Sequence, residues 1–271
     1  MSKVLVTGAA TGIGRDTAIA LAERGHDVIA SAASLEDLNE LQQHVKEHGL
    51  KMTFIKLDVL DEQDRKQAAK RKPDVLINNA GVGESGPLIE IPMERVRSNF
   101  ETNVFANLHL AQLVGQRLIR KGEGRIIIVG STAGRLVVPY MGAYHMTKFA
   151  LEAVADNLRT ELEQFGVFVS LIEPGKINTG FNQEMQATKH EWLTEESAYA
   201  FEIPKMKQAE NTFWDGGYST KSVVKAIVHA VEAKKPRTRY VAPRSNAPMI
   251  WLAQFLPDRF VDWATRKVVG L

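Results

Sequence analysis

The sequence TGAATGIG, residues 7–14, follows a short apolar run, KVLV, and precedes a helical pattern from about Arg15 to Arg24. A glycine-rich turn between a strand and a helix lets the backbone approach a pyrophosphate closely, and the first N–H groups of the helix then face the anion. Glycine is common in strand–helix turns, but in this context the motif favours a dinucleotide site. We expect that site to include the turn residues Gly8, Thr11, Gly12, Ile13 and Gly14.

Short β-branched runs alternate with helical patterns beyond this turn. The expected strands are HDVIAS, MTFIKLDV, PDVLINNAG, GRIIIVGSTAG and VFVSLIEPG. Strands that are apolar along their whole length are buried on both faces, and strands that alternate with helices form parallel sheets. The sequence therefore predicts an α/β fold: a single-domain, doubly wound parallel sheet of the Rossmann type with helices on both faces.

One domain over residues 1–271 is the simplest organisation, because no linker or repeat interrupts the pattern. The polar segment at about 181–219 breaks the alternation, and we interpret it as an insertion that covers one edge of the sheet and contributes to the substrate site. Residues from about 236 to 271 form a C-terminal extension with aromatic and basic residues. Such a tail could lie on a membrane surface, but we expect it to cover the substrate pocket or a subunit contact.

The composition excludes several classes of protein. The chain is 44% hydrophobic and 24% charged, as in ordinary globular proteins, and its net charge of +2 gives no field that would attract nucleic acid. The absence of cysteine excludes disulfides, thiolate zinc sites and a cysteine nucleophile. No run of about 18 apolar residues predicts a membrane span. The N-terminal apolar run is too short for a signal peptide, so we expect a cytoplasmic protein.

We predict no metal site. His44 and His48 are four residues apart on an expected helix, which is a possible two-ligand spacing. A third ligand is not evident, and the charged residues between them indicate a solvated helix.

Further motifs follow the glycine turn in a definite order. NNAG stands at residues 78–81, Asn103 lies in the next helix, and Ser131 ends a strand. Tyr144 and Lys148 are four residues apart and therefore share a helix face, and PG stands at residues 174–175. With the spacing TGxxxGxG, this set resembles the short-chain dehydrogenase/reductase family over roughly residues 3–181. The sequence from Tyr144 to Gly175 and the extended tail are similar to its hydroxysteroid and retinol dehydrogenase branch.

The resemblance implies a catalytic group of Asn103, Ser131, Tyr144 and Lys148. Tyr144 would exchange a proton with the substrate oxygen, and Ser131 would orient that oxygen. Because a free phenol has a pKa of about 10, we expect the Lys148 cation to lower the pKa of Tyr144. Lys148 would also bind the nicotinamide ribose, and Asn103 would hold a water that relays protons. His145, where many relatives have serine, is expected to matter little.

The resemblance also implies the remaining nicotinamide cofactor contacts: Asp58, Val59, Asn79, Ala80, Gly81, Tyr144, Lys148, Pro174, Gly175, Ile177 and Thr179. At the end of the second strand, an acid selects NAD and a nearby arginine accommodates NADP. Neither occurs at Ala32 or Ala33. We favour NADP(H) over NAD(H), with Ser31, Ser34 and Arg15 as candidate ligands of the 2′-phosphate, while loose specificity remains an alternative.

The substrate site is expected to be apolar, because the loops that the resemblance assigns to it contain several large hydrophobic side chains. The candidates are Ser131, Val137, Met141, Tyr144, Phe181 and Met185. The predicted activity is hydride transfer between NAD(P)(H) and a lipophilic secondary alcohol or ketone, in a homodimer or homotetramer. Two alternatives stay open: an NAD(P)-binding sensor or scaffold without catalysis, and an epimerase or dehydratase on the same scaffold.

Overall fold

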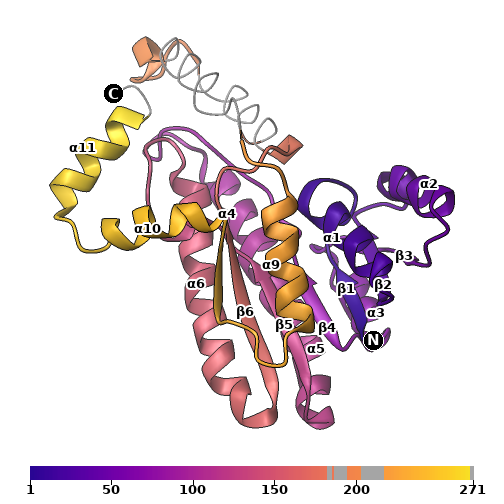
Figure 1. The fold of residues 1–271 in the computed structure, drawn as a ribbon. Helices are drawn as coiled ribbons and strands as arrows, with labels where there is room; N and C mark the ends of the chain where they lie inside the picture. The colour runs from indigo at the N-terminus through magenta and orange to yellow at the C-terminus, as the bar shows by residue number, and fades with distance from the viewer. Residues whose placement is uncertain (182–184, 186–193, 203–216, 269–271) are drawn as a thin grey trace.

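The structure is a computed structural model that describes residues 1–181, 185, 194–202 and 217–268. A seven-stranded parallel sheet with the order β3-β2-β1-β4-β5-β6-β7 forms its centre (Figure 1). The strands are β1 (Lys3–Val6), β2 (Asp27–Ala32), β3 (Thr53–Lys56), β4 (Val75–Asn78), β5 (Gly124–Val129), β6 (Val167–Pro174) and β7 (Arg239–Ala242). The chain winds outward from β1 to β3 and returns to β4 on the other side of β1, which confirms the doubly wound prediction.

Helices cover both faces of the sheet. One apolar core contains residues of α1 (Gly12–Glu23), α2 (Asn39–Glu47) and α9 (Lys221–Glu232). The other contains residues of α3 (Glu62–Lys70), α5 (Asn107–Lys121) and α6 (Gly142–Leu162). The sheet is therefore the middle layer of three, and its central strands are largely buried.

The central strands show why an unbroken apolar run becomes a buried strand. In β5, Ile127 packs into the first core, whereas Ile126 and Ile128 pack into the second. Successive side chains of a strand point to opposite faces, so both faces of this strand need apolar residues. The polar residues that carry chemistry are left to the carboxyl ends, where the strands leave the core.

Two segments differ from the predicted elements. The single helix expected over residues 96–122 is divided into α4 (Met93–Phe100), a π-helical segment at Glu101–Ala106 and α5. The tail forms two helices, α10 (Ala247–Ala253) and α11 (Asp258–Val268). Most of the predicted insertion at 181–219, including Trp192, lies outside the described residues.

Candidate active site

A cavity of about 780 Å³ lies at the carboxyl ends of the strands and extends from the end of β2 to α10 and α11. In an open parallel sheet this edge is where ligands bind. Many predicted site residues line the cavity: Gly8, Thr11, Gly12, Ile13, Asp58, Val59, Asn79, Ala80, Gly81, Ser131, Met141, Tyr144, Lys148, Pro174, Gly175, Ile177, Thr179, Phe181 and Met185. Six do not: Gly14, Arg15, Ser31, Ser34, Asn103 and Val137.

The glycine turn fits a pyrophosphate. Gly8 and Gly12 have positive φ angles of 61° and 53°, and Thr11, at the N-cap of α1, makes no side-chain capping hydrogen bond. The first N–H groups of the helix are therefore not capped by this side chain. Gly14 has a packing role instead of the predicted contact, because a Cβ on it would lie 2.1 Å from the carbonyl oxygen of Gly8.

The NNAG motif is tied directly to this turn. The Thr7 hydroxyl accepts hydrogen bonds from the N–H groups of Asn79 and Ala80, each at 2.9 Å. The Asn79 amide donates to the carbonyl oxygens of Thr7 and Gly8 at 2.9 and 3.0 Å. These bonds join the ends of β1 and β4, so the second motif fixes the shape of the first.

Ser131, Tyr144 and Lys148 meet in the floor of the cavity. Ser131 follows β5, and Tyr144 lies in the first turn of α6, where it is 8% exposed. The Tyr144 hydroxyl and the Ser131 side chain are hydrogen-bonded. Lys148, one turn further along α6, donates from Nζ to the Val129 carbonyl oxygen at 3.2 Å and lies 5.4 Å from the centroid of the Tyr144 ring.

The acid–base properties of this group differ from the expectation. Burial raises the pKa of Tyr144 to about 12, although its hydrogen bond with Ser131 opposes the shift. Burial also lowers the pKa of Lys148 to about 8. Desolvation disfavours the charged form of each group and outweighs the attraction that we expected to lower the pKa of Tyr144. Tyr144 is therefore a protonated phenol at neutral pH.

Asn103 lies behind the cavity wall, in the π-helical segment, and is 1% exposed. Its side chain exchanges two 2.8 Å hydrogen bonds with the backbone of Val82 and donates to the Thr147 hydroxyl at 3.1 Å. Thr147 is part of α6. Asn103 therefore links the loop after β4 to the helix of Tyr144, and its predicted role in a water relay stays a prediction.

His145 contributes more to the site than its sequence position indicated. Its Nδ1 is 2.7 Å from the Ala133 carbonyl oxygen, and its Nε2 accepts from the Val138 N–H at 3.1 Å. Burial lowers the pKa of His145, which favours the neutral ring that these two contacts require. His145 holds the loop after Ser131 against α6. A buried histidine beside a tyrosine at a helix start gives no sequence signal for this role.

A buried group of charged residues lies next to the catalytic helix. Arg135 contacts Glu173 at 3.2 Å, and Arg239 contacts Glu152 at 3.1 Å. Glu173 is 2% exposed and Glu152 13%. Burial and the neighbouring Glu173 carboxylate raise the pKa of Glu152 to about 7. These residues come from the Ser131 loop, from β6 just before Pro174, from α6 and from β7, so they join the segments that hold the reacting groups.

The predicted ligands of a 2′-phosphate do not reach the cavity. Ser31 is fully buried and donates its hydroxyl hydrogen to the Val6 carbonyl oxygen. Ser34 and Asp37 exchange reciprocal hydrogen bonds of 3.1 and 3.2 Å at the start of the helical turn that leads into α2. Asp37 itself lines the cavity beside Ala32 and Ala33. An acid near the end of β2 is thus present, but it comes from a turn four residues beyond Ala33.

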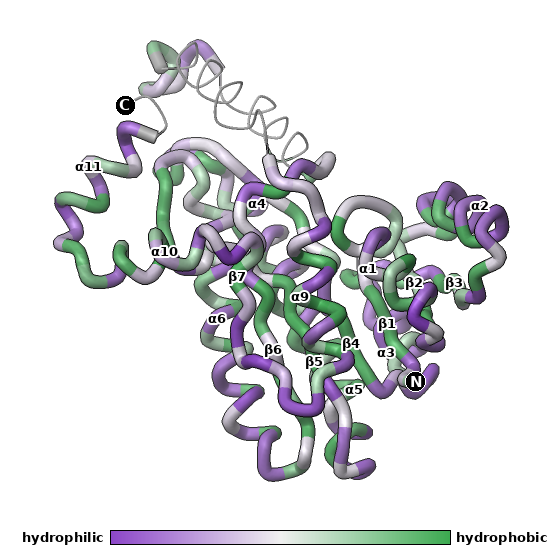
Figure 2. The backbone as a smooth tube through the Cα atoms, viewed as in Figure 1, coloured by the Kyte–Doolittle hydropathy of each residue, from purple (hydrophilic) through white to green (hydrophobic). Residues whose placement is uncertain are grey.

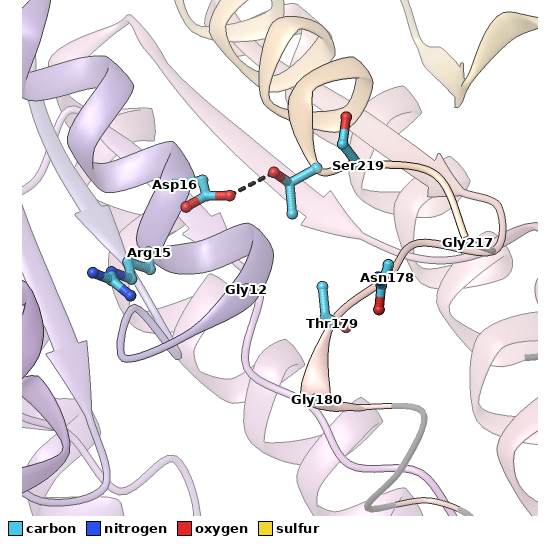
Figure 3. A pocket seen from close by; sticks show the side chains of 9 residues that line it. Gly12, Arg15, Asp16, Asn178, Thr179, Gly180, Gly217 and Ser219 are labelled. Atoms are coloured by element: carbon cyan, nitrogen blue, oxygen red, sulfur yellow. Dashed lines mark hydrogen bonds between the residues drawn. The ribbon is translucent and has the colours of Figure 1, made fainter. Parts of the chain in front are cut away.

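Arg15 lies at the edge of a second cavity, of about 420 Å³, on the outer side of the glycine turn (Figure 3). Its guanidinium points away from the other labelled side chains and pairs with Glu40 of α2 at 3.5 Å. Asp16 and Thr220 are hydrogen-bonded across the same cavity, which joins α1 to α9. Arg15 is a surface residue of α1 in this arrangement.

The substrate side of the main cavity is largely apolar. Phe181 packs against Tyr144 with ring centroids 5.6 Å apart, and Met185 is 2% exposed. Val137 is 52% exposed, while its neighbours Leu136 and Val138 line the cavity in its place. The C-terminal helices contribute Met249, Ile250 and Thr265. Residues of the tail therefore form part of the cavity lining.

The described residues contain neither a metal-binding cluster nor a membrane-spanning helix. No group of three or more histidine, aspartate or glutamate side chains there could hold a metal ion. Among the helices in this part of the chain, none has the length and hydropathy to cross a membrane.

Comparisons with known proteins agree with this geometry. The family model for short chain dehydrogenase matches residues 2–190. The NADPH-dependent 3-dehydrocapnine reductase of Ornithobacterium rhinotracheale is 31% identical over 97% of this chain and 95% of its own length. Human retinol dehydrogenase 8 is 30% identical over 87% of this chain and 79% of its own.

A solved structure gives the same result. A short-chain dehydrogenase from Streptomyces avermitilis superimposes with a TM-score of 0.77 at 27% identity, over 93% of this chain and 92% of that one. The protein is an NAD(P)-dependent oxidoreductase and belongs to the short-chain dehydrogenase family.

Proposed function

We propose that the protein reduces a lipophilic ketone to a secondary alcohol with NADP(H), and that it catalyses the reverse oxidation when the alcohol is supplied. The observation that carries this proposal is the position of Tyr144, which lies between an apolar region and the glycine turn within one cavity. The protonated phenol is suited to the acid of a reduction.

The proposed mechanism divides the work between the floor residues. The bound nicotinamide supplies the hydride. Ser131 holds the substrate oxygen next to the Tyr144 hydroxyl, which donates its proton as negative charge develops on that oxygen. Lys148 Nζ lies 5.4 Å from the centroid of the Tyr144 ring, and its positive charge would stabilise the phenolate that remains. Asn103 and His145 keep α6 and the Ser131 loop in place.

Two features support the lipophilic substrate. The cavity lining includes Met141, Phe181, Met185 and Ile250, and this apolar surface favours an apolar substrate body. The similar human protein is named for retinol, which is a lipophilic alcohol. The proposed substrate therefore carries no carboxylate or phosphate that a charged side chain would have to bind.

The preference for NADP(H) is supported by the space beside Ala32 and Ala33 and by the NADPH-dependent relative. Ser31 and Arg15 do not support this preference, because neither residue lines the cavity. Asp37 opposes a phosphate, although its carboxylate accepts a hydrogen bond from the Ser34 N–H. We keep NADP(H) as the preferred cofactor and treat Asp37 as the residue that limits the preference.

We also propose a cytoplasmic homodimer or homotetramer. Phe105 follows α4 in the π-helical segment, and Met146 and Phe149 lie on α6; all three are 41–52% exposed. Pairing through these helices would bury them. Light scattering of the wild type and of Phe149→Glu tests this, since a monomeric variant is expected.

The central test is a pair of fluorescence titrations with NADPH and NADH on the wild type and Tyr144→Phe, with turnover of ketones of increasing chain length. Both proteins should bind a reduced cofactor, NADPH more tightly, and only the wild type should oxidise it. Failure of the wild type to bind either nucleotide would overturn the proposal. Binding without turnover of any ketone would favour the sensor alternative.

A further inference from the structure

The outer surface of the two C-terminal helices is unusually rich in exposed aromatic side chains. Trp251, Phe255, Phe260 and Trp263 are 50–68% exposed, and Leu252 is 52% exposed. The rings form two pairs, Trp251 with Phe255 at 4.8 Å and Phe260 with Trp263 at 5.7 Å. We call these five residues the aromatic patch. Exposed apolar surface of this kind on a protein usually marks an interaction site.

The inner surface of the same helices belongs to the cavity. Ile250 is 3% exposed and Thr265 is 8% exposed, and both line the cavity together with Met249. The patch and the substrate region are therefore opposite sides of one thin cover. Figure 1 shows α11 at the periphery of the molecule, farther from the sheet than α10.

Positive charges surround the patch. In α11, Arg259, Trp263 and Lys267 recur every four residues and form one stripe, and Phe260 and Arg266 flank it. Arg244, Arg259, Arg266 and Lys267 are exposed, and none of them forms an ion pair with another described residue. Asp258 and Asp262 lie at the edge of this stripe. Figure 2 shows the resulting mixture of hydrophobic and hydrophilic residues along α11.

This combination fits an anionic lipid surface. Tryptophan and phenylalanine enter the interfacial region of a bilayer, while arginine and lysine beside them contact the headgroups. Attraction to anionic headgroups contributes about 1 kcal/mol for each such cation near the surface. For subunit pairing, α6 already offers the exposed side chains of Met146 and Phe149.

We propose that the aromatic patch and its cations dock the protein peripherally on an anionic membrane, with the cover of the cavity facing the lipid. A lipophilic ketone or alcohol could then pass between the bilayer and the cavity without crossing water. The second statement depends on the proposed function, whereas the docking itself does not.

The test is sedimentation of the full-length protein with vesicles of phosphatidylcholine alone and with phosphatidylglycerol added, without cofactor or substrate. The wild type should bind the anionic vesicles and lose most binding at high salt. The triple variant Trp251→Ala, Phe255→Ala, Trp263→Ala should bind at least about tenfold more weakly. Its turnover of a small water-soluble ketone should stay unchanged, since these residues do not line the cavity.

The matched control is Phe165→Ala with Phe168→Ala, which removes two aromatic side chains of 40% and 39% exposure near the amino end of β6. Wild-type protein that stays in the supernatant at low salt would overturn the docking proposal. Equal loss in the control would do the same. A patch variant that turns a dimer into a monomer in light scattering would show a subunit contact instead. Failure of the proposed function would appear separately, as vesicle binding without cofactor binding.

Discussion

The floor and the cover of the cavity are built on different principles. The floor consists of Ser131, Tyr144 and Lys148 with the buried charges of Glu152 and Glu173 beneath them, and hydrogen bonds fix each side chain. The cover consists of Phe181, Met185, α10 and α11, where contacts are mainly apolar. Catalysis needs fixed distances between the reacting groups, whereas binding of a lipophilic molecule needs only a complementary shape and the exclusion of water. Substitutions in the floor should therefore change turnover, and substitutions of those cover residues that line the cavity should change substrate affinity.

The largest expected effect separates the two regions most clearly. Tyr144→Phe removes the proposed proton donor but keeps the ring that packs against Phe181. We expect kcat to fall by about 10³-fold, within the usual range for loss of a general acid. Cofactor affinity should change little. Stopped-flow measurement of NADPH oxidation checks this, and turnover within tenfold of the wild type would remove Tyr144 from the mechanism.

The second largest effect should come from the glycine turn, at the cofactor end of the floor. In Gly14→Ala the new methyl group would lie 2.1 Å from the Gly8 carbonyl oxygen, so the turn must shift. Overpacking of this kind costs about 2 kcal/mol, and we expect NADPH to bind about 30-fold more weakly. Gly180→Ala is the control, since no atom of the described residues other than Gly180 and its chain neighbours lies within 4 Å of its Cβ position. Equal NADPH affinities of the two variants would contradict the proposal that the glycine turn binds the cofactor.

Phe181→Ala tests the cover. Removal of a partly buried aromatic side chain should cost about 1.5 kcal/mol of substrate binding, which raises KM for a long-chain ketone about tenfold. Because Phe181 donates and accepts no proton, kcat should stay within a few-fold. A variant in which kcat falls and KM is unchanged would show that the cover also positions the reacting groups. Steady-state kinetics over a series of chain lengths makes this distinction.

A variant of Glu152 tests the buried group of charged residues beneath the floor of the cavity. Its pKa is about 7 in the folded protein, against 4.5 for a glutamate in water, so the folded state keeps a proton that the unfolded state loses as the pH rises through this window. Stability should therefore fall between about pH 4.5 and 7, by on the order of 1 kcal/mol from this residue. Urea unfolding at pH 5 and pH 8 should show a smaller difference for Glu152→Gln than for the wild type. Glu161→Gln, on the exposed side of α6, is the control.

The smallest effect is expected at the rim beside β2. Asp37→Asn removes a negative charge from the cavity next to Ala33. Because the site is exposed, the gain in NADPH affinity should be only about two- to fivefold, with NADH affected less. Glu36→Gln changes the charge of the neighbouring residue, which does not line the cavity. If both variants bind NADPH equally, Asp37 has no specific part in cofactor choice.

The sequence was most informative at positions where the chemistry allows only one type of residue. Ser131, Tyr144 and Lys148 were predicted through the resemblance of their motifs to a known family, and helix spacing by itself indicated only that Tyr144 and Lys148 share a face. The roles of His145 and Glu152 could not be predicted, since they depend on partners at Val138 and Glu173 that only packing brings near. The prediction of ligands for the 2′-phosphate was limited for the same reason. Ser31 does lie in β2, but its hydroxyl is buried and donates a hydrogen bond to the Val6 carbonyl oxygen.

The sequence by itself determined the sheet, the glycine turn and the polar residues at the strand ends, because local periodicity and turn chemistry act over a few residues. The tertiary structure alone decided the properties that depend on burial. The first is the pKa of Tyr144, and the second is the presence of Asp37, and not Ser34, in the cavity wall. The third is the arrangement of α10 and α11, which line the cavity with some residues and expose aromatic side chains with others. Burial is a property of segments far apart in the chain, and no short stretch of residues specifies it.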